Sequence, residues 1–256
     1  MIHGFRGDHH GMDLIGAAVR DREVIVPDLP GFGESGPLPG GLGLDSYCAH
    51  IAALIAEVTD RWQAPPILAG HSFGSILTAH TARTHPELVP ELILINPITS
   101  PALEGPATVM TALTRLYYDL GARLPEAWGR RLLANPVIVR LMSEVMATTR
   151  DPGLRRYIHD QHDRHFSTFS DRQSLAQAFE VSVAHTVTEV AADLSMPVLV
   201  IAGDRDAIAP ISVTRDFVAG LADARFVELS GVGHLVHYER PEAAASAIMD
   251  FSRERD

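Results

Sequence analysis

The chain has 256 residues, of which 46% are hydrophobic and 21% charged, and its formal net charge is −11. Such an acidic chain lacks the clustered basic residues with which non-specific nucleic-acid binders neutralise phosphate, and it has no basic amphipathic segment that would seek an anionic membrane. Cys48 is the single cysteine, so an intrachain disulfide and a cysteine-based metal site are excluded. Residues 1–4 carry no export signal, which predicts a cytoplasmic protein.

The first hundred residues alternate between apolar segments and helical patterns. Strands are predicted over residues 24–27, 66–69 and 92–97. Helices are predicted over Leu44–Trp62, where Cys48 would be a packed thiol, and over residues 75–85. Because each strand is apolar throughout, the pattern indicates a parallel sheet that is covered on both faces.

Residues 101–189 interrupt this alternation. They contain no convincing strand, and the sequence predicts helices over residues 108–121, 126–133, 137–148, 154–165 and 174–188. A connection of this length is uncommon inside a compact domain. We therefore expect an inserted helical lid, with residues 1–100 and 190–256 forming the core. In the last part, strands are predicted over residues 197–202 and 225–229, and helices over residues 212–221 and 241–251.

A Gly-x-Ser-x-Gly pentapeptide occupies residues 70–74, between a predicted strand and a predicted helix. This context is the one that a nucleophile elbow requires. Its serine, Ser72, would sit on a turn so sharp that the backbone is strained. Glycine at positions 70 and 74 would prevent a collision between the strand and the helix. The N–H group of Phe73, at the start of the helix, would be free to bind a developing oxyanion.

Polar residues follow two of the later strands. Asp204 and Asp206 come after the strand at residues 197–202, and His234 comes after the next strand in the segment Gly-Val-Gly-His. Loops after parallel strands emerge at the same edge of a sheet, so Ser72, an aspartate and His234 can converge. The chain order of serine, aspartate and histidine is typical of one particular fold.

With these residues, the chain resembles the α/β-hydrolases, and among them the capped serine enzymes that cleave esters or carbon–carbon bonds. The resemblance extends over nearly the whole chain. Beyond the pentapeptide it rests on four segments: His3-Gly4-Phe5, Asp28-x-Pro30-Gly31-x-Gly33-x-Ser35, Gly203-Asp204-x-Asp206-x-x-x-Pro210, and Gly233-His234 leading into Glu239-Arg240-Pro241. It implies an α/β fold, a mostly parallel α/β-hydrolase sheet with helices on both faces and an inserted helical lid.

The resemblance also implies a role for each site residue. Ser72 would attack a carbonyl carbon, His234 would take and return its proton, and Asp206 would hold the imidazole. The N–H groups of Phe5 and Phe73 would form the oxyanion hole. The implied partner is a small-molecule substrate, and neither a cofactor nor a metal is expected.

Alternative interpretations exist for several polar residues. Asp204 competes with Asp206 for the role of the acid, but the family pattern places the acid just before the residues that lead to proline. Some relatives carry the acid after the earlier strand, where this chain has Asn96, which cannot carry the charge. His9 and His10 are expected in a solvated loop rather than at the rim of the pocket.

A second group of polar residues suggests a metal site at first sight. His159, His162 and His165, together with Asp160 and Asp163, recur at helical spacing in the predicted lid. Metal sites, however, need ligands that further contacts hold in place. A hydrated face of the lid is therefore the favoured interpretation.

The N-terminus departs from the family pattern. Two or three strands normally precede the His-Gly pair, whereas two residues precede it here. We expect either that the natural start lies upstream of Met1, the explanation that we favour, or that a strand from a second chain fills the gap, as in a homodimer. If Met1 is the start, we expect an exposed sheet edge, reduced stability and a weakly held Phe5 donor.

The leading hypothesis is a serine hydrolase that acts on a small to medium, largely apolar ester or related carbonyl compound. Carbon–carbon bond hydrolysis of ring-cleavage products is the alternative, and it would need cationic lid residues in the pocket, for which the candidates are Arg115, Arg123, Arg130 and Arg140. A non-catalytic ligand-binding relative is the third hypothesis. Apolar faces over Ser72 are expected from Leu113, Leu116, Tyr117, Leu132, Leu133, Val137, Ile138, Leu141 and Met142.

Overall fold

A computed structural model of the chain describes residues 1–100 and 108–254. Its sheet has four strands in the order β1 (Leu68–His71), β2 (Leu92–Ile95), β3 (Val198–Gly203) and β4 (Ala224–Leu229). All neighbouring strands are parallel, with Gly70 opposite Leu94 and Leu94 opposite Val200. Every residue of β1, β2 and β3 is buried, because helices cover both faces. The predicted parallel sheet is therefore confirmed.

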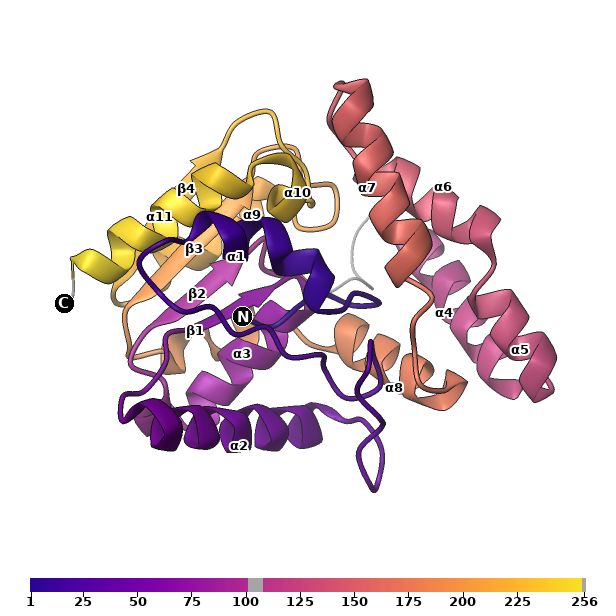
Figure 1. Cartoon of the computed structure of the whole chain (residues 1–256), viewed down its shortest axis with the longest axis horizontal. Helices are drawn as coiled ribbons and strands as arrows, with labels where there is room; N and C mark the ends of the chain where they lie inside the picture. Colours follow the sequence, from indigo (N-terminus) through magenta and orange to yellow (C-terminus); the bar gives the residue numbers. More distant parts are fainter. Residues whose placement is uncertain (101–107, 255–256) are drawn as a thin grey trace.

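Alternate residues of each strand enter two different cores, since side chains along a strand point to opposite faces. Leu92 and Leu94 belong to one core, which is covered by α2 (Leu44–Trp62) and α3 (Phe73–Thr84). Ile93 and Ile95 belong to the other, which is covered by α1 (Asp13–Ala18) and α11 (Pro241–Arg253). Figure 1 shows these helix pairs on either side of the sheet. Two short helices, α9 (Ile211–Ala219) and α10 (Val236–Glu239), follow β3 and β4.

The edge of the sheet next to β1 is formed by the first residues of the chain. The N–H of Ile2 donates to the carbonyl of Ala69 at 2.7 Å, and the N–H of His71 donates to the carbonyl of Ile2 at 3.0 Å. Beyond them, the amino group of Met1 donates to the carbonyl of Ile25 at 2.7 Å. The strand predicted over residues 24–27 is absent. A strand needs a ladder of hydrogen bonds, whereas among the described backbone contacts residues 24–27 meet the first residues of the chain through Ile25 and Met1.

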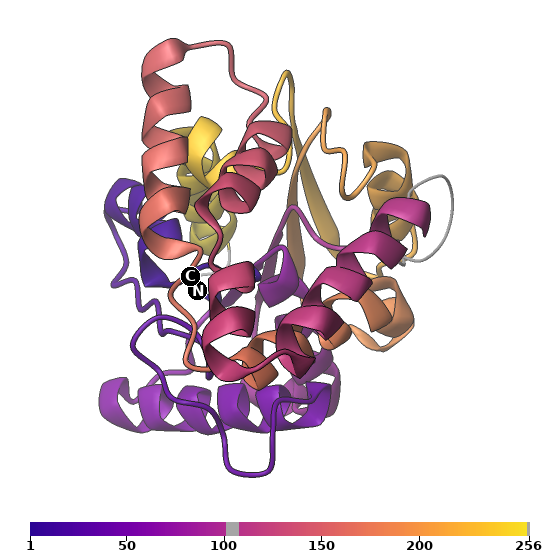
Figure 2. The same cartoon turned by 90° about the vertical axis from the view of Figure 1, so that its right-hand side faces the viewer.

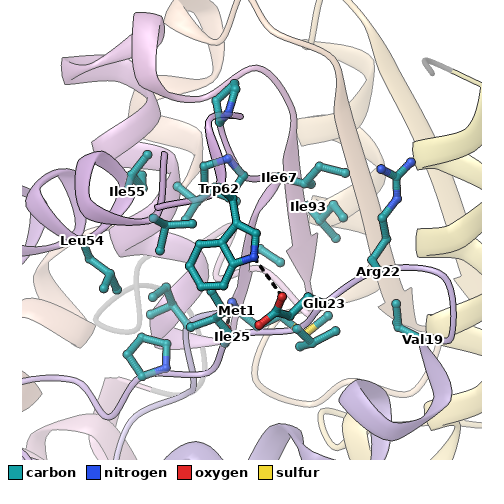
Figure 3. A pocket seen from close by; sticks show the side chains of 18 of the residues that line it. Met1, Val19, Arg22, Glu23, Ile25, Leu54, Ile55, Trp62, Ile67 and Ile93 are labelled. Carbon is teal, nitrogen blue, oxygen red and sulfur yellow. Dashed lines mark hydrogen bonds between the residues drawn. The ribbon is translucent and has the colours of Figure 1, made fainter. Parts of the chain in front are cut away.

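A pocket of about 320 Å³ lies along this edge, between α2, residues 19–27 and β1. Figure 3 shows that it is mostly apolar, with Leu54 and Ile55 of α2 facing Met1 and Ile25. Its charged lining residues are Arg22 and Glu23, and the carboxylate of Glu23 accepts a hydrogen bond from the indole of Trp62 at 2.9 Å. Ser72 does not line this pocket.

The segment before residue 24 also differs from the expected loop. It forms a 3-10 helix, η1 (His9–Met12), which continues into α1. The carboxylate of Asp8 caps η1 by accepting the N–H of His10 at 3.0 Å. His9 and His10 thus lie on a short helix and not in an open loop.

Five helices follow β2 within the described residues: α4 (Thr108–Arg123), α5 (Glu126–Leu133), α6 (Pro136–Met146), α7 (Pro152–His165) and α8 (Arg172–Ala184). Figures 1 and 2 show α4 to α7 gathered on one side of the sheet. Asn135 and Asp151 cap α6 and α7 with their side chains, and a proline follows each cap, which is a favoured way to begin a helix. The assignment of these helices to a separate lid stays a prediction.

The lid helices expose more apolar surface than expected. Of the nine apolar residues predicted to form faces over Ser72, Leu133 is fully buried, whereas Leu113, Leu116, Val137 and Leu141 are each more than half exposed. Ser143 and Val139 of α6 instead point inward. None of the described helices combines the length and the apolarity needed to cross a membrane.

Candidate active site

Ser72 forms the turn between β1 and α3, with φ 53° and ψ −118°. A positive φ in a residue other than glycine costs about 1–3 kcal/mol, so packing around the turn has to hold it. A Cβ atom at Gly70 would lie 2.3 Å from the carbonyl oxygen of Gly74, and one at Gly74 would lie 2.3 Å from that of Ile2. The two glycines are therefore needed for close approach, as the sequence predicted for the elbow.

The structure brings Ser72, His234 and Asp206 together in one line of hydrogen bonds. The Oγ of Ser72 lies 2.7 Å from Nε2 of His234, and Nδ1 of the same ring lies 2.7 Å from Oδ2 of Asp206. The tautomer that satisfies both contacts carries its proton on Nδ1 and accepts the serine hydroxyl at Nε2. His234 and Asp206 are buried, because the loops after β3 and β4 leave the sheet side by side.

Asp206 is held ionised by the groups around it. Its Oδ1 accepts the backbone N–H groups of Ile208 at 2.8 Å and Ala209 at 3.1 Å. Burial alone would favour the neutral acid, but the charge and hydrogen bond of His234, with these two N–H groups, hold the pKa of the carboxyl below its usual value. A buried carboxylate that stays charged can in turn stabilise a protonated imidazole.

Asn96 completes the surroundings of Asp206 through a contact that is not predicted from the sequence. It follows β2 with φ 44°, and its Nδ2 donates to Oδ2 of Asp206 at 2.8 Å and to the carbonyl of Gly233 at 3.3 Å. From the sequence, Asn96 is only a residue that cannot replace the acid. Its place directly after an apolar strand, at the same sheet edge as Asp206, was a signal that could have revealed the contact.

Asp204 does not contact His234. Its Oδ1 accepts the N–H of Gly231 at 2.7 Å, and its Oδ2 accepts the hydroxyl of Ser230 at 2.9 Å. It therefore connects the loop after β3 to the loop after β4 and is not the acid that holds His234.

Two backbone amides lie beside Ser72. Phe73 is the first residue of α3, so its N–H has no acceptor within the helix. On the other side, a Cβ atom at Gly4 would lie 3.3 Å from Cβ of Ser72, which places the Gly4–Phe5 peptide against the serine. The ring of Phe5 packs edge-on against Phe32, Phe73 and Tyr118. The role of both N–H groups as an oxyanion hole remains a prediction.

Arg6, next to Phe5, connects this peptide to the lid helices and was not singled out from the sequence. Its side chain is buried, and its backbone has φ 63°. The guanidinium donates to the carbonyls of Leu133 at 2.7 Å and Phe166 at 2.9 Å, and to the hydroxyl of Tyr118 at 3.2 Å. Leu133 is the last residue of α5, and Phe166 directly follows the last residue of α7, so the negative ends of two helix dipoles face the buried cation.

The expected hydrated face of histidines on the lid is wrong for two of its members. His159 and His162 are buried, and their Nδ1 atoms lie 2.6 and 2.7 Å from Oγ of Ser143. Their helix packs them against α6, whereas Asp160 and Asp163 remain exposed. The two carboxylates thus lie apart from the two buried rings.

His165 instead joins His10 and His9 in a stack of rings, with centroids 4.1 and 3.9 Å apart. Asp8 accepts hydrogen bonds from the rings of His10 and His165, and Asp28 accepts both the ring N–H and the backbone N–H of His9. Within the described residues, two groups have ligand atoms close enough together to hold a metal ion: Asp8 with His9 and His10, and His80 with His185 and Glu189. Neither group includes Ser72, Asp206 or His234.

Comparison with known proteins identifies the family. A family model described as the alpha/beta hydrolase fold matches residues 1–241 of this chain. The chain belongs to the α/β-hydrolase family. The resemblance inferred from the elbow and the two later loops is therefore correct.

Relatives within the α/β-hydrolases are distant. The uncharacterized hydrolase YugF of Bacillus subtilis is 24% identical, with 98% of this chain and 88% of YugF covered. A putative carbamate hydrolase of Azorhizobium caulinodans is 25% identical, with 94% and 85% covered. Among solved structures, a thermophilic esterase from Thermogutta terrifontis superposes with a TM-score of 0.76 at 24% identity, covering 99% and 88% of the two chains. This structural likeness shows the shared fold.

Proposed function

We propose that this α/β-hydrolase is a serine hydrolase that cleaves small to medium, largely apolar esters or related carbonyl compounds. The observation that carries the proposal is the line of two 2.7 Å hydrogen bonds from Ser72 through His234 to Asp206. A serine hydroxyl is a weak nucleophile, and it needs a base within hydrogen-bond reach that is itself oriented by a third group. All three roles are filled here by residues from three different loops.

In the first half of the proposed reaction, Oγ of Ser72 attacks the carbonyl carbon of the ester while Nε2 of His234 takes its proton. Asp206 keeps the other ring nitrogen protonated and stabilises the imidazolium that forms. The tetrahedral intermediate then collapses. The bond to the alkoxy group breaks, His234 returns the proton to the leaving alcohol, and the acyl group stays on Ser72.

The negative oxygen of the tetrahedral intermediate would be held by the N–H groups of Phe73 and Phe5. Both peptides are fixed before substrate arrives, Phe73 by α3 and Phe5 by the ring contacts around it. Donors that need no rearrangement are effective at this step, and the loss of one typically lowers turnover by about 10²–10³-fold.

In the second half, a water molecule gives its proton to His234 and attacks the acyl carbon. The second tetrahedral intermediate collapses, and Ser72 leaves with the proton that His234 returns to it. The products are a carboxylic acid and the regenerated enzyme. No redox step or further reactant is involved, so the cycle balances with one water per ester.

The charges of the lid favour esters over the carbon–carbon bond alternative. That chemistry would need a cation to hold the carboxylate or enolate of the substrate. The four lid arginines considered for this purpose each pair with a lid carboxylate: Arg115 with Glu180, Arg123 with Asp119, Arg130 with Glu126 and Arg140 with Asp163. The ring of Phe5, which follows the Gly4–Phe5 peptide beside Ser72, packs in an apolar cluster with Phe73 and Tyr118. These apolar surroundings favour an apolar acyl group.

The test is turnover of p-nitrophenyl esters of increasing acyl length, next to a ring-cleavage product, by the wild type and by Ser72→Ala. We expect ester hydrolysis by the wild type that falls to the uncatalysed rate in the variant. Ser182→Ala is the matched control, because that hydroxyl only bonds the carbonyl of Phe179 within α8. Cleavage of the ring-cleavage product without ester turnover would overturn the ester assignment, and a wild type inactive on both would favour a ligand-binding protein.

A further inference from the structure

A polar pocket of about 260 Å³ lies beside the loops that carry Asp206 and His234. It is formed by residues 148–150 between α6 and α7, by Arg205, by Gly231 and Val232, and by Glu239 and Arg240. Nothing in the proposed hydrolytic mechanism uses these side chains. The pocket contrasts with the apolar one next to α2, because most of its lining can form hydrogen bonds.

Three guanidinium groups surround this pocket: Arg150, Arg205 and Arg240. All three are exposed, and none forms an ion pair within the part of the chain that the structure describes. The sequence holds 21 arginines, no lysine and 32 acidic residues, so carboxylate partners are plentiful elsewhere. Three like charges around one polar hollow repel one another and attract an anion, although water and salt screen exposed groups.

The carboxylates nearest to the pocket are already engaged. Both oxygens of Glu239 turn inward and accept the N–H groups of Thr148 at 2.7 Å and Thr149 at 2.9 Å, as well as the hydroxyl of Thr148. Asp204 accepts two hydrogen bonds in the loop after β4, and Asp151 caps α7. No described carboxylate forms an ion pair with the three arginines, although Glu239 lines the pocket and the charge of Asp204 acts on Arg205.

We propose that this pocket binds a phosphate-type anion, either inorganic phosphate or the phosphate of a monoester. Planar guanidinium groups match phosphate oxygens with paired hydrogen bonds. The site is separate from the candidate oxyanion hole, which uses backbone N–H groups, so it goes beyond the proposed hydrolysis. It is coupled to the loop of His234 because the hydroxyl of Thr148 accepts the N–H of Gly233 at 2.9 Å and itself donates to Glu239.

The experiment is isothermal titration calorimetry of the full chain with inorganic phosphate in a low-chloride buffer. We expect saturable one-to-one binding that weakens as sodium chloride is added, because exposed charge pairs are screened. Arg150→Gln and Arg240→Gln should each weaken binding about tenfold, since each removes one charge-assisted contact. Arg150→Lys keeps the charge and should recover part of the affinity.

Arg123→Gln is the matched control, because Arg123 is an exposed arginine of α4 outside the pocket, with a distant ion pair of 4.0 Å to Asp119. It should bind phosphate like the wild type. Absence of saturable binding, or equal weakening in Arg123→Gln and the pocket variants, would overturn the proposal. Ester turnover of the same variants is measured in parallel, so that failure of the anion site and failure of the hydrolytic function are seen separately.

A second arm identifies the source of the phosphate. Vesicles of phosphatidylcholine with and without phosphatidic acid are sedimented with the protein. Retention that depends on phosphatidic acid and is lost in Arg150→Gln assigns the phosphate to a lipid headgroup. Binding of inorganic phosphate without retention on vesicles assigns it to a soluble phosphate compound.

Discussion

Asp206 is the residue on which the electrostatics of the candidate site depend. Its carboxylate receives four hydrogen bonds, from His234, Asn96 and two backbone N–H groups. A buried charge with this many donors stays ionised and has a fixed orientation. The orientation matters because the imidazole of His234 must present Nε2 to Ser72 in one tautomer.

At this scale, removal of the Asn96 amide should impair catalysis without preventing folding. Asn96→Gly keeps the positive φ that glycine tolerates, and it deletes the donor to Asp206. A hydrogen bond to a charged group contributes about 1.5–3 kcal/mol, so we expect kcat to fall about tenfold to a hundredfold. Steady-state kinetics on a p-nitrophenyl ester measures the change.

The control for that prediction is Asn135→Gly in the lid. Asn135 caps α6, where glycine costs only a few tenths of a kcal/mol, and it does not contact the candidate triad. Its kcat should equal that of the wild type. A wild-type kcat in Asn96→Gly would show that the amide does not orient Asp206.

At the scale of elements, Arg6 is the contact that connects the Phe5 peptide to α4, α5 and the end of α7. Arg6→Met keeps much of the apolar stem but leaves the carbonyls of Leu133 and Phe166 without their donor. An unsatisfied buried carbonyl costs about 1–3 kcal/mol, so we expect a loss of about 3 kcal/mol in the free energy of unfolding. Urea denaturation followed by circular dichroism measures it.

Limited proteolysis should show faster cleavage within residues 108–170 of Arg6→Met, because the lid loses an attachment to the core. Arg123→Met is the matched control, since that guanidinium is exposed and makes one long ion pair. It should change stability by less than about 0.5 kcal/mol. An equal free energy of unfolding for Arg6→Met and Arg123→Met would contradict the claim that Arg6 attaches the lid helices to the core.

Elements with a continuous local signal were predictable from the sequence. The helix Leu44–Trp62 has the predicted bounds, because its apolar residues recur at helical spacing and Ser46 bonds back to Gly43 at its start. The Ser72 turn was predictable for a related reason. Its Gly70 is required by a contact within the turn itself, with the carbonyl of Gly74, whereas Gly74 is required by a contact with the distant Ile2.

Elements and contacts that depend on distant partners were not predictable. Residues 24–27 have the composition of a strand, but the ladder that would pair with them is absent. The side chain of Asp8 caps the N-terminus of η1, and this cap is not predicted from the sequence. Similarly, the residues next to Arg6 in sequence do not predict its hydrogen-bond acceptors. These are carbonyls at the ends of α5 and α7, more than a hundred residues later in the chain.

For the whole molecule, buried histidines make stability depend on pH. Burial lowers the pKa of His71 and of His162 to about 3, and it lowers that of His237 well below its usual value. In the unfolded chain these groups titrate near the ordinary histidine pKa of about 6.5. The stability that these neutral histidines contribute is therefore fully present above about pH 6.5. It is lost as the pH falls towards their pKa values in the folded protein.

Between about pH 7 and about pH 5, a histidine with this shift should cost about 2 kcal/mol of stability. Urea denaturation at both pH values measures the loss. His162→Gln should reduce this loss of stability by about the contribution of one histidine. His85→Gln is the control, because the side chain of His85 is 40% exposed and lies outside the buried group. If His162→Gln and the wild type lost the same stability between the two pH values, the proposed contribution of buried His162 to acid sensitivity would be contradicted.

The proposed hydrolytic function depends on one reactive oxygen, Oγ of Ser72. The most direct measurement is tandem mass spectrometry of the protein after treatment with a fluorophosphonate, a reagent that phosphonylates a serine activated by a neighbouring base. We predict a single adduct on the peptide that contains Ser72, and no adduct in His234→Ala. Labelling at a different serine, or an unmodified Ser72 in the folded wild type, would contradict the account.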